Sequence, residues 1–80
     1  MQEKYCLDFV LRAYGHTVQT IRNALAEFGE NLEIAEGSVE SGEARDFSIR
    51  LFTEDPTLIF DACSQLGRIK SVKVEEERRL

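Results

Sequence analysis

The sequence has few of the residues with which small domains usually build cross-links and metal centres. Its 80 residues include two cysteines, one histidine and one proline, and there is no tryptophan. Cys6, Cys63 and His16 are too few for a four-ligand structural zinc site within one chain. Cys-x-x-Cys and glycine-rich phosphate-binding motifs are also missing, which argues against metallochaperones and nucleotide-binding enzymes. We therefore expect no metal and no cofactor.

Long apolar runs are missing too, and no stretch approaches the roughly 18 apolar residues that a membrane helix needs. Residues 1–4 lack the basic-then-apolar order of a signal peptide. Two widely separated cysteines in such a chain predict a cytoplasmic protein with reduced thiols. A Cys6–Cys63 disulfide stays conceivable, although the alternation of the first strand argues against it.

Positive charge is in deficit, since 15 acidic residues outnumber 10 basic ones and the net charge is −5. This balance argues against binding to nucleic acid and to anionic membranes. The length corresponds to a single domain, residues 1–80, and a hydrophobic content of 42% is that of a globular protein. A domain this small gains stability from self-association.

Hydrophobic periodicity predicts six elements. Strands are expected over residues 5–13, 32–39, 47–51 and 69–74, and helices over residues 17–28 and 55–66. The order βαββαβ predicts an α+β fold, a ferredoxin-like two-layer sandwich with a four-stranded antiparallel sheet and two helices on one face. The residues expected to face the core are Tyr5, Leu7, Phe9, Leu11, Val18, Ile21, Ala24, Leu25, Phe28, Phe47, Ile49, Leu51, Ile59, Ala62, Cys63 and Leu66.

Local signals place the element boundaries. Thr17 is the expected N-cap of the first helix, and Gly29 its left-handed terminator. Asp55 and Pro56 mark the start of the second helix, which Gly67 ends. A kink is expected near Gly37 and a turn at Ser41-Gly42, and residues 75–79 are expected to fray.

The other face of the sheet should be uncovered. A cross-strand ion pair between Asp8 and Arg50 is expected there. Phe52 is the one aromatic residue expected on this face that could stack on a nucleic-acid base. This face is therefore a poor match for an RNA-recognition domain. Phe52 and Phe60 fall outside the core stripes and are candidates for subunit contact. The expected open-face residues are Cys6, Asp8, Val10, Arg12, Ser48, Arg50, Phe52, Lys73 and Glu75.

Few residues are candidates for catalysis or for anion binding. His16, the one group that ordinarily titrates near neutral pH, follows Gly15 at the start of a helix. This loop is either an anion-binding turn or an ordinary solvated one. Cys63 belongs to an apolar helix stripe, and neither cysteine has a histidine near it in sequence, so no catalytic residues are assigned. The acidic residues near the hairpin, Glu36, Glu40 and Glu43, form a solvated rim.

Several segments resemble the ACT domain, a small regulatory module of ferredoxin-like topology. The resemblance lies in residues 9–15, which end in Gly15, in the helix pattern of residues 18–29, in the Asn31-Leu32 pair and in residues 65–74. It implies binding of a small molecule, most often an amino acid, at an interface between paired domains. Tyr14 stands where the family usually has proline.

Carried over to this chain, the family's contacts fall on the first loop and the start of the second strand. The implied ligand-binding residues are Arg12, Gly15, His16, Asn31 and Leu32. We therefore expect a non-enzymatic regulatory domain, a homodimer or higher homo-oligomer, with an amino-acid ligand and a regulated protein partner. The alternative is a protein–protein interaction module without a small-molecule ligand. An enzymatic role for His16 or Cys6 is the weakest of the three hypotheses.

Overall fold

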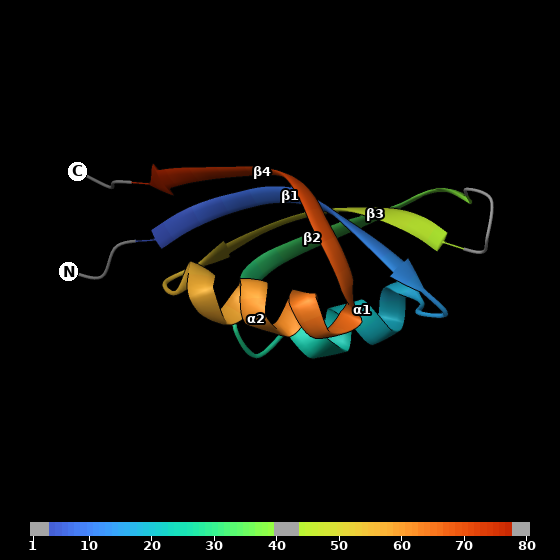
Figure 1. Ribbon diagram of the computed structural model, residues 1–80. Helices are drawn as coiled ribbons and strands as arrows, with labels where there is room; N and C mark the ends of the chain where they lie inside the picture. Colours follow the sequence, from blue (N-terminus) through green and yellow to red (C-terminus); the bar gives the residue numbers. More distant parts are fainter. Residues whose placement is uncertain (1–3, 40–43, 78–80) are drawn as a thin grey trace.

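A computed structural model describes residues 4–39 and 44–77 of the chain. The elements are β1 (Lys4–Tyr14), α1 (Val18–Leu25), β2 (Glu30–Val39), β3 (Ala44–Thr53), α2 (Pro56–Leu66) and β4 (Gly67–Glu77). The strands form one antiparallel sheet in the order β2-β3-β1-β4. Both helices lie on the same face of this sheet (Figure 1). The expected α+β class, with its order of elements and four-stranded antiparallel sheet, is confirmed.

The core lies between the sheet and the helices, as the alternating pattern predicts. Alternate residues of β1 and β3 point towards the helices, because successive side chains of a strand point to opposite faces. On the helices, the three- and four-residue steps bring one stripe of each against the sheet. The fully buried side chains of this core are Leu7, Phe9, Leu11, Ile21, Leu25, Phe47, Ile49, Leu51, Ile59 and Cys63.

The starts of both helices follow the predicted caps. The Thr17 hydroxyl accepts a hydrogen bond from the Thr20 amide at 3.2 Å. The Asp55 carboxylate accepts one from the Thr57 amide at 3.1 Å, and Pro56 occupies the first turn of α2. Each cap satisfies an amide that has no partner within the helix, so these short helices begin at defined residues.

The predicted end of the first helix is wrong. The helix ends at Leu25, and Ala26 caps it in a right-handed conformation. Gly29 does not have a positive φ, so it is no left-handed terminator. Close packing explains the glycine instead, because a Cβ there would lie 3.0 Å from Leu51 Cδ1 and 3.2 Å from the Phe52 carbonyl oxygen.

The expected fraying after residue 74 is also wrong for the part of it that is described. β4 continues to Glu77, and Glu75 and Glu76 pair with Cys6 and Tyr5 of β1. Arg78 and Arg79 lie outside the described residues. Pairing with a central strand satisfies backbone groups that an isolated tail would leave to water.

The structure also tests the expectations for Phe60 and for the strand around Gly37. Phe60 is not a free surface aromatic, because its ring meets Phe9 edge-to-face at a centroid distance of 5.8 Å. The kink near Gly37 is confirmed by a register shift between Glu36 and Val39. The Ser41-Gly42 turn, with Glu40 and Glu43, lies outside the described residues.

We expect Gly67→Ala to destabilise the fold strongly. A Cβ at Gly67 would collide with the Arg12 carbonyl group, whose carbon would be 2.9 Å away, and the rigid paired backbone of β1 cannot yield as a side chain could. The expected loss is about 1–3 kcal/mol or more of unfolding free energy, measured by urea denaturation. The matched control is Gly15→Ala, where φ is +69° but nothing lies within 4 Å. Only the backbone conformational cost of about 1 kcal/mol is expected there. Equal losses for both variants would contradict this account of Gly67.

Candidate functional site on the open face of the sheet

The sheet face opposite the helices carries a row of alternating charge. Directly paired residues of antiparallel strands lie on the same face. The register pairs Glu33 with Arg50, Arg50 with Asp8, and Asp8 with Lys73, across β2, β3, β1 and β4. All four side chains are exposed. Asp8 and Arg50 are direct cross-strand partners, but the ion pair expected between them is not among the salt bridges of the described residues. We call these four residues the charged row.

A second charged cluster lies further along the same face. Arg12 Nε donates a hydrogen bond to Asp46 Oδ1 at 2.9 Å, and Lys70 Nζ lies 3.2 Å from Asp46 Oδ2. The hydrogen bond from Arg12 lowers the pKa of Asp46, assisted by Lys70 and opposed by partial desolvation. Asp46 therefore remains ionised and fixes the Arg12 guanidinium against the sheet.

Arg50 interacts with side chains of both neighbouring strands on the open face. Its hydrogen bond with the Cys6 side chain is the largest of the interactions that raise the pKa of Arg50, and the carboxylates of Glu33 and Asp8 act in the same direction. Arg50 and Phe52 also line more than one of the shallow hollows of this face. Arg50 is thus a permanent cation whose charged form is favoured by side chains on both adjacent strands, Cys6 and Asp8 on β1 and Glu33 on β2.

One hollow brings together two of the residues assigned from the family resemblance. It has a volume of about 530 Å³ and is lined by Asn31, Leu32, Glu33, Arg50 and Phe52. Asn31 has φ of +52°, a left-handed conformation that asparagine tolerates better than most residues. The register shift between Glu30 and Glu33 accompanies it. The hollow therefore combines a cation, a carboxylate, an amide and two apolar walls.

The other assigned residues lie at the opposite end of the sheet. Glu30 pairs with Phe52, and Phe52 with Cys6, whereas Gly15 and His16 follow Tyr14 at the far end of β1. At about 3.4 Å per strand residue, Gly15 lies about 30 Å from the start of β2. Arg12 is near the Gly15 end and is engaged by Asp46. One copy of the chain therefore does not gather these five residues into one pocket.

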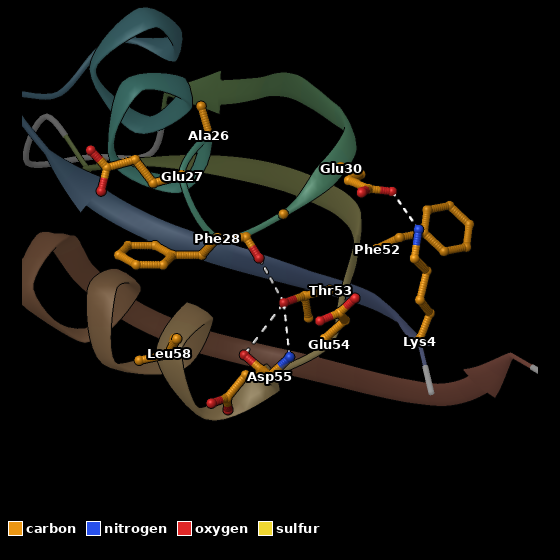
Figure 2. A pocket seen from close by; sticks show the side chains of 11 residues that line it. Lys4, Ala26, Glu27, Phe28, Glu30, Phe52, Thr53, Glu54, Asp55 and Leu58 are labelled. Carbon is orange, nitrogen blue, oxygen red and sulfur yellow. Dashed lines mark hydrogen bonds and ion pairs between the residues drawn. The ribbon is translucent and has the colours of Figure 1, made fainter. Parts of the chain in front are cut away.

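A second hollow, of about 480 Å³, lies where the α1–β2 and β3–α2 connections meet (Figure 2). Thr53 organises it: its hydroxyl donates to the Phe28 carbonyl at 2.7 Å and accepts from the Asp55 amide at 3.1 Å. At its edge, Lys4 Nζ lies 2.6 Å from Glu30 Oε2. These contacts tie two connections together, and we assign this hollow a structural role.

Sequence reasoning missed Glu33 as a binding candidate and treated Arg50 only as half of an ion pair. The available signal was that Glu33 falls on the outward phase of its strand, but its position opposite Arg50 depends on a bulge.

Within residues 4–39 and 44–77, no three His, Cys, Asp or Glu side chains cluster as a metal site would require. Neither of the described helices has the length and apolar character to cross a bilayer. Comparison with protein-family models, curated proteins and solved structures finds no match.

The two thiols should differ sharply in reactivity. Cys63 is fully buried, and burial raises its pKa to about 11, whereas Cys6 is a partly exposed residue of the open face. A thiolate is the reactive species, so we expect Ellman's reagent to modify one thiol per native chain and the second only after unfolding. Mass spectrometry of peptides should place the native label on Cys6, with Cys6→Ser as the control. If Cys63 in the folded chain were labelled as fast as Cys6, the assignment would be contradicted.

The depressed pKa of Asp46 predicts a stability contribution on the acid side. The native state holds this carboxylate ionised more strongly than the unfolded chain, whose ordinary value is 3.8. The contribution is therefore present above pH 4 and is lost as the pH falls through the native pKa. Urea midpoints between pH 2 and 6 should fall less steeply for Asp46→Asn than for the natural chain. Parallel profiles would show that the pairing with Arg12 adds no net stability.

Proposed function

We propose that this chain is a non-catalytic regulatory domain that binds an amino acid on the open face of its sheet. The observation that carries the proposal is the hollow lined by Asn31, Leu32, Glu33, Arg50 and Phe52. In the fuller form of the proposal, the domain resembles ACT domains, acts as a homodimer or higher homo-oligomer, and passes the ligand signal to a protein partner.

The architecture supports a ferredoxin-like, ACT-like assignment. The βαββαβ order is joined to the strand order β2-β3-β1-β4, with both helices on one face (Figure 1). Right-handed crossovers of two β-α-β units with this strand order give the ferredoxin-like arrangement. A fold does not identify a ligand, so the ligand class has to be inferred from the chemical groups that line the hollow.

The hollow has complementary groups for a zwitterion. A guanidinium binds a carboxylate through two parallel hydrogen bonds, and Arg50 provides one. Glu33, its neighbour across β2 and β3, can accept hydrogen bonds from an ammonium group. Asn31 offers an amide, and Phe52 provides apolar surface for a side chain. Leu32 also lines the hollow, although it packs against the core as well. These groups favour an amino acid with an apolar side chain over a simple anion.

The placement of the nucleophiles supports the non-catalytic part of the proposal. A Cys–His pair would need hydrogen-bond contact. Cys6 is paired with Phe52, and His16 lies beyond Tyr14, which is itself about 27 Å from Cys6 along β1 at the rise of a strand. Cys63 is buried in the core on the other side of the sheet. Neither thiol therefore has the histidine beside it within one copy, although Glu75 is the cross-strand partner of Cys6.

A second candidate function, a protein-interaction module without a ligand, is favoured by one specific observation. The charged row crosses the full width of the sheet and remains exposed, as a docking surface for a protein would. In that case Arg50 would contact a protein partner, and free amino acids would leave the domain unaffected.

Calorimetric titration with a panel of amino acids tests the proposal. We expect an apolar amino acid to bind, and Arg50→Gln to weaken binding about 10–100-fold through loss of a charge-assisted contact. Asn31→Gly should also weaken binding, while glycine retains the positive φ of this position. His16→Ala, at the far end of the sheet, is the matched control and should bind normally.

Two results would overturn this assignment. Absence of binding by every amino acid at millimolar concentration would remove the ligand and favour the interaction module. Binding that is lost in His16→Ala but kept in Arg50→Gln would move the site to the Gly15 loop.

A further inference from the structure

Both edges of the sheet are built in a way that discourages strand-to-strand association. β2 and β4 are the edge strands, and each is interrupted by a residue in the left-handed region, Asn31 at φ +52° and Ser71 at φ +57°. The pairing register shifts beside each of them. Bulges and charged side chains on edge strands prevent another chain from adding to the sheet. The open face is the broad surface that remains.

The charge pattern of this face has a particular symmetry. From β2 to β4 the charged row reads Glu33, Arg50, Asp8, Lys73, which is negative, positive, negative, positive. A two-fold axis parallel to the strands, between β3 and β1, would reverse the strand order of a second copy laid on this face. Glu33 would then oppose the second copy's Lys73, and Arg50 would oppose the second copy's Asp8.

Within the second charged cluster, the Arg12–Asp46 pair has the same symmetry. Asp46 lies on β3 and Arg12 is its direct partner on β1, so the pair straddles the same line between the two central strands. The same two-fold axis would place Asp46 opposite the second copy's Arg12. Three charge pairs thus become complementary under one operation, as an isologous interface favours. On the row that contains Phe52 and Cys6, the same operation places Glu30 opposite the second copy's Glu75, so that row opposes like charges.

From this complementarity we propose that two copies of the chain pack open face to open face about a two-fold axis parallel to their strands. Two sheets stack at about 10 Å, with strand directions within about 30° of each other. β1 is 11 residues long and the sheet has four strands, so the face measures about 37 by 19 Å, or about 700 Å² per copy. Two such faces match the area of specific protein interfaces, which is about 1,200–2,000 Å² in total.

This inference deepens the subunit-interface part of the proposed function, on which it rests only for its biological role. The row containing Glu33 and Arg50 borders the hollow that we assign to the amino acid. The second copy's Asp8 and Lys73 would cover that hollow and add one carboxylate and one ammonium group to its walls. The ligand would then lie between the two copies.

Complementation between two charge-reversed chains tests the interface. Glu33 and Lys73 lie on opposite edge strands, three strand spacings or about 14 Å apart within one copy. In a Glu33→Lys homodimer two lysines would face each other at both ends of the row, and in a Lys73→Glu homodimer two glutamates would. We expect each variant alone to dimerise about tenfold more weakly or worse than the natural chain. An equimolar mixture should regain the natural affinity, because both ends of the row are then complementary.

The measurement is sedimentation velocity over a concentration series without ligand, with native mass spectrometry of one isotopically labelled chain to identify the heterodimer. Arg22→Glu on α1 and Asp61→Lys on α2 change the same charges on the helix side of the sheet, and both should dimerise normally. A purely structural defect in either variant would persist in the mixture, because mixing repairs nothing within a chain.

Three outcomes would overturn the interface: a natural chain that is monomeric throughout the series, variants that dimerise like the natural chain, or a mixture no stronger than its components. Because no amino acid is present, any of these leaves the ligand proposal to its own titration. Conversely, a dimer restored by mixing together with no amino-acid binding would retain the interface and remove the ligand.

Discussion

The two-residue alternation of β1 is the constraint on which both the core and the open face depend. β1 pairs with β3 on one side and β4 on the other. Its inward residues fill the core, while Asp8 and Arg12 on the outward phase supply charges to the open face. A one-residue slip would expose the core residues and bury these charges. The hydrophobic effect that selects the register therefore also fixes which charges meet on the other side.

Sequence signals predicted the features that depend on neighbours in the chain. The caps at Thr17 and Asp55 and the alternation of β1 are set within a few residues, and they are confirmed. Features set by distant contacts were missed. Gly29 is a glycine because Leu51 and the Phe52 carbonyl lie against it, and Phe60 is held by Phe9. No local pattern contains those contacts.

The candidate site was predicted only in part, for a related reason. A family resemblance selects positions along the chain, and it grouped Asn31 and Leu32 with Gly15 and His16. The structure separates these pairs by the length of β1 and instead places Arg50 and Glu33 beside Asn31. That placement depends on the bulge between Glu30 and Glu33, which sets the phase of the rest of β2. Pairing across a bulge cannot be inferred from alternation within one strand.

The distribution of charge limits how tightly the open face can bind anything. Six of the eight basic residues that the structure describes lie on the open face by their register: Lys4, Arg12, Arg50, Arg68, Lys70 and Lys73. They are interleaved there with acidic residues. Burying such charges costs desolvation energy that opposing charges only partly return, so a face of this kind favours specific, reversible and salt-sensitive association over a permanent dimer. A zwitterion held between two such faces would add contacts to both copies at once. Ligand binding and association would then strengthen each other by the same factor, as thermodynamic linkage requires.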